Sequence, residues 1–255
     1  IRGTIRYESL VFTYAEIINS ASEKLILPNY IRLTPWTTVS NTNTVFINMD
    51  QINTAASTVK LHIETNHTLP SYVNISGRQI SMPNFLKLEI LSIQNIYEGL
   101  HQSIILQNYN TAPNPSESMT GRKLNYLNYM NAAENIRSFI HDNGRAPNFS
   151  TTEAGNIRYE SIIYTYAQLL NYYNVNNALP RHITVTPWSV VSNPNTVTFN
   201  PGQIIKGAET IVSYVEANHN LPTSVNIAGT SVSMSKFLKL SLTTLQNING
   251  NLYGQ

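Results

Sequence analysis

The sequence predicts an α+β fold that is predominantly helical, built from helix–short β-hairpin–helix units and internally duplicated. Two observations carry this prediction: a gapless internal repeat, and apolar residues at helical spacing on both sides of a short alternating segment in each copy. With 255 residues the chain can bury a sizeable core without disulfides, and it contains no cysteine.

The repeat has a constant offset of 152 residues. The string IRYES begins at Ile5 and again at Ile157, and the same offset carries Thr34-Pro35-Trp36 onto Thr186-Pro187-Trp188. About half of the aligned positions are identical, which implies one structural unit used twice. We predict a first copy over residues 1–107, a linker rich in Pro, Asn, Ser and Gly over 108–121, and a second copy over 122–255.

A helix expected over residues 124–142 opens the second copy and has no counterpart in the first. We therefore expect that the first copy lacks its N-terminal helix and that the chain was cut from a longer repeat array. The sequence leaves open whether the two copies form separate domains.

The first helix of each unit is predicted from apolar residues near helical spacing before Asn66 and before Asn218. Asn tolerates a left-handed backbone, so both residues are expected to cap their helices. Pro70 and Pro222 follow, and proline prevents the helix from continuing.

The segment after this proline step predicts a hairpin and a second helix. Residues 73–81 alternate around Gly77, which is typical of a tight hairpin or a bulge. Ser81 is placed to N-cap a helix that we expect to run from Met82 to about Gln107.

The composition excludes several classes of partner. Only 12% of the residues are charged, against about 25% in ordinary domains, and the net charge is +2. Nucleic-acid binding needs a concentrated basic face, and the sequence shows none. No apolar run reaches the ~18 residues of a membrane span. The neutral hydrogen-bonding and aromatic side chains that replace charge suit sugars and peptides.

The repeated motif runs Ile-Glu-x-Asn, then Leu-Pro, then Val-x-Ile-x-Gly-x-x-Val-Ser-Met, then Phe-Leu-x-Leu. It resembles the pseudomurein-binding repeat of methanogenic archaea, which occurs in adhesin-like surface proteins and in the targeting domains of pseudomurein endoisopeptidases. Residues 56–96 and 208–248 carry the resemblance best, and 133–170 is a divergent version.

The resemblance implies an extracellular, cell-surface location and attachment to pseudomurein, a wall polymer of amino-sugar strands cross-linked by short peptides. It implies no catalysis in this chain, because the family's hydrolases use a Cys, His and Asp triad and cysteine is absent here. We expect a non-catalytic carbohydrate- and peptide-binding anchor that gains avidity from its duplicated sites.

Candidate ligand contacts are residues that recur in both copies. Trp36 and Trp188 could stack on a sugar face, although a core position is the stronger alternative because Trp is usually highly buried. At the helix ends, amide and imidazole groups could contact an acetamido group or a peptide carboxylate, although helix capping explains them equally well. Those residues are Asn66, His67, Asn218 and His219.

A second recurring pair could clamp a carboxylate: Arg6 with Tyr7, and Arg158 with Tyr159. The alternative is that each Arg pairs with the Glu two residues on and that each Tyr fills the core. We expect no cofactor and no metal ion, since His62 and His67 lack the His-Glu-x-x-His spacing of a zinc site.

Two other functions remain open. An enzyme would need a recurring pair of carboxylates, and the acids that recur are Glu8 with Glu160 and Glu64 with Glu216, which no other feature marks as a site. A purely structural role, as a stalk or self-association module that forms homo-oligomers, needs no ligand at all.

Overall fold

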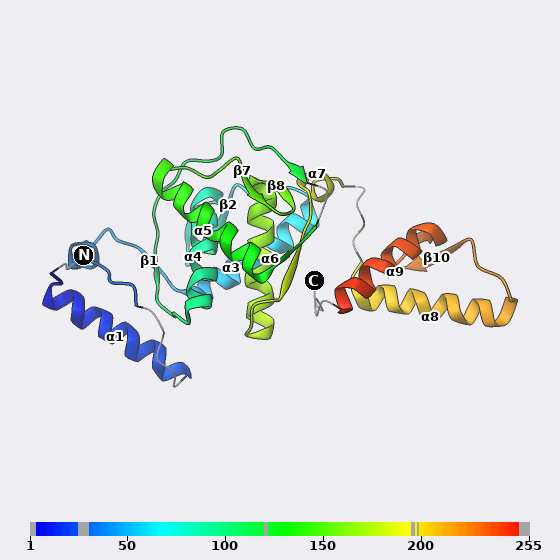
Figure 1. Cartoon of the computed structure of the whole chain (residues 1–255), viewed down its shortest axis with the longest axis horizontal. Helices are drawn as coiled ribbons and strands as arrows, with labels where there is room; N and C mark the ends of the chain where they lie inside the picture. Colours follow the sequence, from blue (N-terminus) through cyan, green and yellow to red (C-terminus); the bar gives the residue numbers. More distant parts are fainter. Residues whose placement is uncertain (1–3, 25–30, 120–121, 195–196, 198, 250–255) are drawn as a thin grey trace.

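The computed structural model describes residues 4–24, 31–119, 122–194, 197 and 199–249. Their helices and small antiparallel sheets form a helix-rich α+β fold, which confirms the predicted fold class. Figure 1 shows three parts in a row: a central body, an N-terminal part on one side of it and a C-terminal part on the other.

The central body pairs two helix–hairpin–helix units, one from each copy of the repeat. α6 packs along α3 and α4, and α4 also packs along α5, so the two copies share one body. The first unit contains α3 (Met49–Asn66), β2 (Tyr72–Ile75), β3 (Arg78–Ser81) and α4 (Met82–Glu98). The second contains α5 (Tyr126–Asn143), β7 (Phe149–Thr152), β8 (Gly155–Arg158) and α6 (Tyr159–Asn176).

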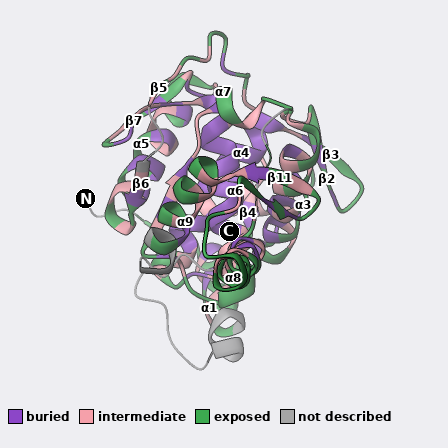
Figure 2. Cartoon of the chain, turned by 90° about the vertical axis from the view of Figure 1, so that its right-hand side faces the viewer, coloured by how far each residue is buried: buried purple, intermediate pink, exposed green. Residues whose placement is uncertain are grey.

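One hydrophobic cluster fills the central body and draws on both units. Its fully buried side chains include Ile52 in α3, Phe85 and Ile90 in α4, and Ile163 in α6. Figure 2 shows α4 mostly buried and α8 mostly exposed. Because burial of apolar area is the dominant stabilising contribution, most of the folding free energy resides in this body.

Smaller elements flank the body. The N-terminal part holds α1 (Tyr7–Lys24) and α2 (Trp36–Val39), and the C-terminal part holds α8 (Pro201–Asn218), β10 (Ser224–Ile227), β11 (Thr230–Ser233) and α9 (Met234–Asn249). The C-terminal part has a small cluster of its own around Val225, Ile227 and Val232. The remaining elements are β1 (Phe46–Ile47), β4 (Ile104–Ile105), β5 (Ser118–Met119), β6 (Arg122–Asn125), β9 (His182–Val185) and α7 (Trp188–Val191).

The predicted hairpin is confirmed. β2 and β3 are antiparallel and are joined by Ser76 and Gly77, which have φ angles of 50° and 81°. Two successive left-handed residues match the right-handed twist of the flanking strands. The side chain of Asn74 also accepts a hydrogen bond from the Gly77 N–H, which fixes the turn. The predicted helix over 124–142 is observed as α5.

The expected helix caps are displaced by one residue. Asn66 and Asn218 are the last helical residues, and the left-handed C-cap is the following residue, His67 in α3 and His219 in α8. Asn66 instead donates its side-chain amide to the carbonyl of His62, one turn back. Asn66 therefore satisfies a helix carbonyl with its side chain while its own backbone stays helical.

The helix that begins at Met82 is shorter than predicted. It ends at Glu98, because Gly99 takes a left-handed φ of 71° and the Leu100 N–H turns back to the carbonyl of Asn95. The apolar residues that suggested a longer helix form β4, which pairs with β1. Ser81 occupies the N-cap position as predicted, but its side chain makes no capping hydrogen bond.

Part of the stretch predicted as a linker packs on the second unit. β5 pairs with β8 and so extends the β7–β8 hairpin, while Ala112 is buried. Within the described residues, no helix has the length and apolarity that a membrane crossing would need.

Candidate functional site

Three neighbouring pockets, which together we call the groove, lie in the N-terminal part, at its junction with α4, and between α4 and α5. The Trp36 pocket has a volume of about 210 Å³, the Arg32 pocket about 340 Å³ and the Tyr97 pocket about 220 Å³. Leu33, Thr34 and Pro35 line both of the first two pockets. Between the second and third stands an ion pair, in which Arg32 Nη2 lies 3.1 Å from Glu98 Oε2.

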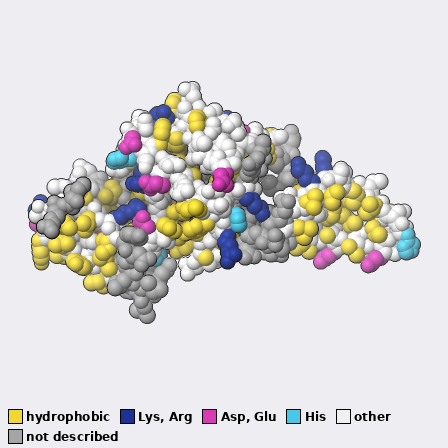
Figure 3. All heavy atoms as spheres, viewed as in Figure 1, with side chains coloured by type: hydrophobic (Ala, Val, Ile, Leu, Met, Phe, Trp, Pro, Cys, Tyr) yellow, Lys and Arg dark blue, Asp and Glu magenta, His cyan; other side chains and the backbone are white. Residues whose placement is uncertain are grey.

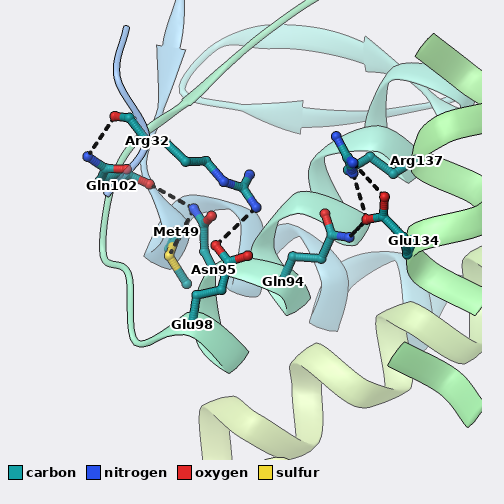
Figure 4. Close-up of polar contacts among 8 residues, drawn as sticks. All are labelled: Arg32, Met49, Gln94, Asn95, Glu98, Gln102, Glu134 and Arg137. Carbon is teal, nitrogen blue, oxygen red and sulfur yellow. Dashed lines mark hydrogen bonds and ion pairs between the residues drawn. The ribbon is translucent and has the colours of Figure 1, made fainter. Parts of the chain in front are cut away.

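The Arg32 pocket has a polar floor formed by the C-terminal half of α4 and the loop after it. Gln102 Nε2 donates to Glu16 Oε2 over 3.1 Å. Asn95 Nδ2 donates to the carbonyl of Gln102 over 3.3 Å (Figure 4). Burial raises the pKa of Glu16, an effect that the hydrogen bond from Gln102 opposes. Amide and carboxylate groups therefore line this part of the groove, and they can exchange hydrogen bonds with sugar hydroxyls or peptide groups.

The Tyr97 pocket combines aromatic rings with a fixed carboxylate. The rings of Tyr97 and Tyr126 lie 5.8 Å apart at 52°. Across the pocket, Glu134 accepts hydrogen bonds from Gln94 and Arg137 (Figure 4). The bonds from Arg137 lead the causes that lower the pKa of Glu134 to about 2, so its charge persists across the physiological pH range.

The Trp36 pocket brings together two of the residues predicted from the repeat. Arg6 and the half-buried Trp36 both line it, and Arg6 also pairs with Glu8 over 3.2 Å. Tyr7 does not line this pocket, and 77% of its surface is exposed. The predicted Arg6–Tyr7 clamp is thus not assembled around one pocket, whereas Arg6 and Trp36 are.

The equivalent region of the second copy is closed. Trp188 and Tyr159 belong to the main core, with 9% and 4% of their surfaces exposed. Arg158 pairs with Glu160 over 2.7 Å. The carboxylate of Glu117 accepts hydrogen bonds from the N–H groups of Trp188 and Ser189 and thereby ties the linker segment to α7.

The helix-end candidates lie outside the groove. His67 Nδ1 lies 2.9 Å from the carbonyl of Val191, so this side chain joins α3 to α7. Asn218 donates to the carbonyl of Tyr214, and His219 is exposed at the end of α8. These residues connect or terminate helices in the structure.

Three of the four recurring acids, Glu8, Glu64 and Glu160, are engaged in ion pairs. Glu8 and Glu160 each pair with the arginine two residues earlier, and Glu64 pairs with Lys60 over 2.9 Å while accepting a hydrogen bond from Tyr164. Carboxylates held in this way stabilise helices and helix contacts. Among the described residues, no cluster of three or more His, Asp or Glu side chains is arranged to hold a metal ion.

Sequence reasoning missed the Tyr97 pocket because all but one of its residues have no identical counterpart in the repeat. At the 152-residue offset, Gln94 recurs as Gln246, but Tyr97 and Glu98 correspond to Asn249 and Gly250, and the other lining residues lie in α5, which packs against α4. A search for recurring residues cannot find a site formed where two units meet. The signal available was this departure from the repeat at the end of α4.

No family model matches this chain, and no curated protein matches its sequence.

Proposed function

We propose that this chain is a non-catalytic cell-wall-binding module that anchors an extracellular surface protein to pseudomurein. The observation that carries the proposal is the groove, whose three consecutive pockets suit successive units of a linear polymer better than one small molecule. The family resemblance of the repeated motif supplies the identity of the polymer.

The side chains of the groove fit an amino-sugar strand with peptide branches. Trp36, Tyr97 and Tyr126 offer apolar ring faces for sugar rings. Gln102 lines the Arg32 pocket with an amide group suited to N-acetyl groups and peptide bonds, and Glu98 offers a carboxylate for an amine. The same binding role would serve an anchor or the targeting part of a wall hydrolase whose catalytic domain lies elsewhere.

Co-sedimentation with purified pseudomurein sacculi, beside bacterial murein sacculi, tests the proposal. We expect selective retention on pseudomurein, and we expect the Trp36→Ala/Tyr97→Ala double variant to bind at least about tenfold more weakly, since each aromatic contact contributes about 1 kcal/mol.

The matched control is Tyr72→Ala, which removes a tyrosine that is 49% exposed on β2 and lines none of the three pockets. Circular dichroism verifies that each variant is folded. Equal retention on both walls would refute specificity for pseudomurein. Absence of retention on either wall would refute wall binding and favour the structural-stalk function.

A further inference from the structure

Two apolar surfaces at opposite ends of the molecule are exposed although their counterparts in the central body are buried. Figure 3 shows hydrophobic side chains gathered over α1 at one end and over the α8–α9 part at the other. The repeat identifies what each surface corresponds to, because α1 is the counterpart of α6, and α9 is the counterpart of α4.

The first surface, the α1 stripe, consists of Tyr7, Val11, Tyr14 and Ile18. These residues are 77%, 50%, 61% and 69% exposed, and their spacing places them on one side of the helix. Their counterparts in α6 are 4%, 0%, 3% and 0% exposed. Those counterparts are Tyr159, Ile163, Tyr166 and Leu170.

The second surface, the α9 stripe, consists of Leu238, Leu242 and Leu245, which are 61%, 55% and 61% exposed. Their counterparts in α4 are Leu86, Ile90 and Ile93, all of them 0% exposed. These positions hold leucine or isoleucine in both copies. The copies differ in that other helices cover this face of α4, whereas no helix among the described residues covers it in α9.

Inside the central body these two faces are buried together. α4 packs along α6, and all seven counterpart residues belong to the one hydrophobic cluster that fills this body. The faces that α1 and α9 expose are therefore the two halves of a helix contact already present in this chain.

We propose that the α1 stripe of one copy of this protein packs on the α9 stripe of a second copy and repeats the α6–α4 contact between molecules. The two stripes of one chain lie on opposite sides of its central body, so a single molecule does not join them (Figure 1). The surfaces are different, so the contact is head-to-tail and can continue from copy to copy.

The association leaves the groove open. Phe12 and Glu16 project from the side of α1 opposite the stripe, where Phe12 packs on Phe46 and Glu16 accepts a hydrogen bond from Gln102 in the Arg32 pocket. Each added copy would therefore add one groove to the assembly, and multivalent binding to a repetitive polymer would strengthen accordingly.

Sedimentation velocity over a concentration series from about 1 µM to about 200 µM tests the proposal, because a small contact of this kind is expected to be weak. The weight-average mass of the wild type should rise with concentration beyond that of a dimer. Val11→Glu and Leu242→Glu, one on each stripe, should each remain monomeric. Leu61→Glu, at a 64% exposed position of α3 outside both stripes, should behave like the wild type.

Mixing the two monomeric variants gives the sharpest outcome. Each retains one intact stripe, so an equimolar mixture should form dimers and nothing larger. A wild type that stays monomeric throughout would overturn the proposal. So would association that survives Val11→Glu or Leu242→Glu, or a mixture that stays monomeric under conditions in which the wild type associates.

Discussion

At the scale of single residues, the central body contains a fully buried carboxyl group. Glu89 in α4 is 0% exposed, and neither of its carboxylate oxygens has a hydrogen-bond partner among the described residues. Burial raises the pKa of this carboxyl well above its ordinary value, so the folded protein holds it protonated where the unfolded chain ionises.

Replacement of this group should stabilise the protein at neutral pH. As pH rises above the ordinary pKa of Glu, the unfolded state releases a proton that the folded state retains, and stability falls by up to about 1.4 kcal/mol per pH unit. Glu89→Gln removes this dependence, so its free energy of unfolding should exceed that of the wild type at pH 7 and approach it near pH 4. Urea denaturation at both pH values measures the difference, and parallel pH profiles for the two proteins would contradict the assignment.

Among single residues, the repeat predicted part of the site. Arg6 and Trp36 were identified from their recurrence and do meet in one pocket. Trp188 recurs equally and is buried, because Glu117 and the second unit surround its segment. Identical local sequence thus gives different exposure, since exposure depends on which element packs on top, and local sequence does not encode that.

At the scale of elements, most helices and both repeated hairpins follow from local chemistry. Alternation around a Gly-containing turn predicts the β2–β3 hairpin, and helical periodicity predicts α3 and α5. The predicted end of α4 was wrong because the apolar residues of β4 continue the periodic pattern beyond Gly99. A two-residue strand is defined by its partner across the sheet, so its own sequence does not reveal it.

Two glycine substitutions separate backbone strain from packing. Gly99 and Gly155 both have positive φ angles, but a Cβ at Gly99 would meet nothing within 4 Å, whereas a Cβ at Gly155 would collide with the backbone carbonyl of Ser118 in β5. Gly99→Ala should cost about 1 kcal/mol from strain alone. Gly155→Ala should cost roughly 2–4 kcal/mol, because β5 must also move. Chemical denaturation measures both, and equal losses would show that the β5–β8 pairing contributes nothing.

At the scale of the whole molecule, the sequence revealed two copies but not how they combine. The repeat left open whether the two copies form separate domains, and in the structure α3 and α4 of the first copy share a core with α5 and α6 of the second. The longer helices outside this core, α1, α8 and α9, are left with one side uncovered. Pairing between units is decided by side-chain fit over long sequence separations, which periodicity does not report.

This unequal burial predicts unequal local stability. The α8–α9 part rests on a small cluster of its own, while α4 and α6 lie in the main core. Amide hydrogen exchange in dilute solution should therefore be much faster in α8 and α9 than in α4 and α6. Uniform protection across all four helices would contradict this division of the molecule.

The central claim is that the groove binds pseudomurein, and Trp36 offers the most direct measurement of it. Because the chain has two tryptophans, Trp188→Phe leaves Trp36 as the sole tryptophan, whose emission can be excited selectively over that of tyrosine. Titration with soluble pseudomurein fragments should change its emission saturably, murein fragments should not, and Tyr97→Ala should weaken the response. Pseudomurein fragments that bind by calorimetry and leave the Trp36 emission unchanged would place the ligand elsewhere, and fragments that do not bind at all would contradict the claim itself.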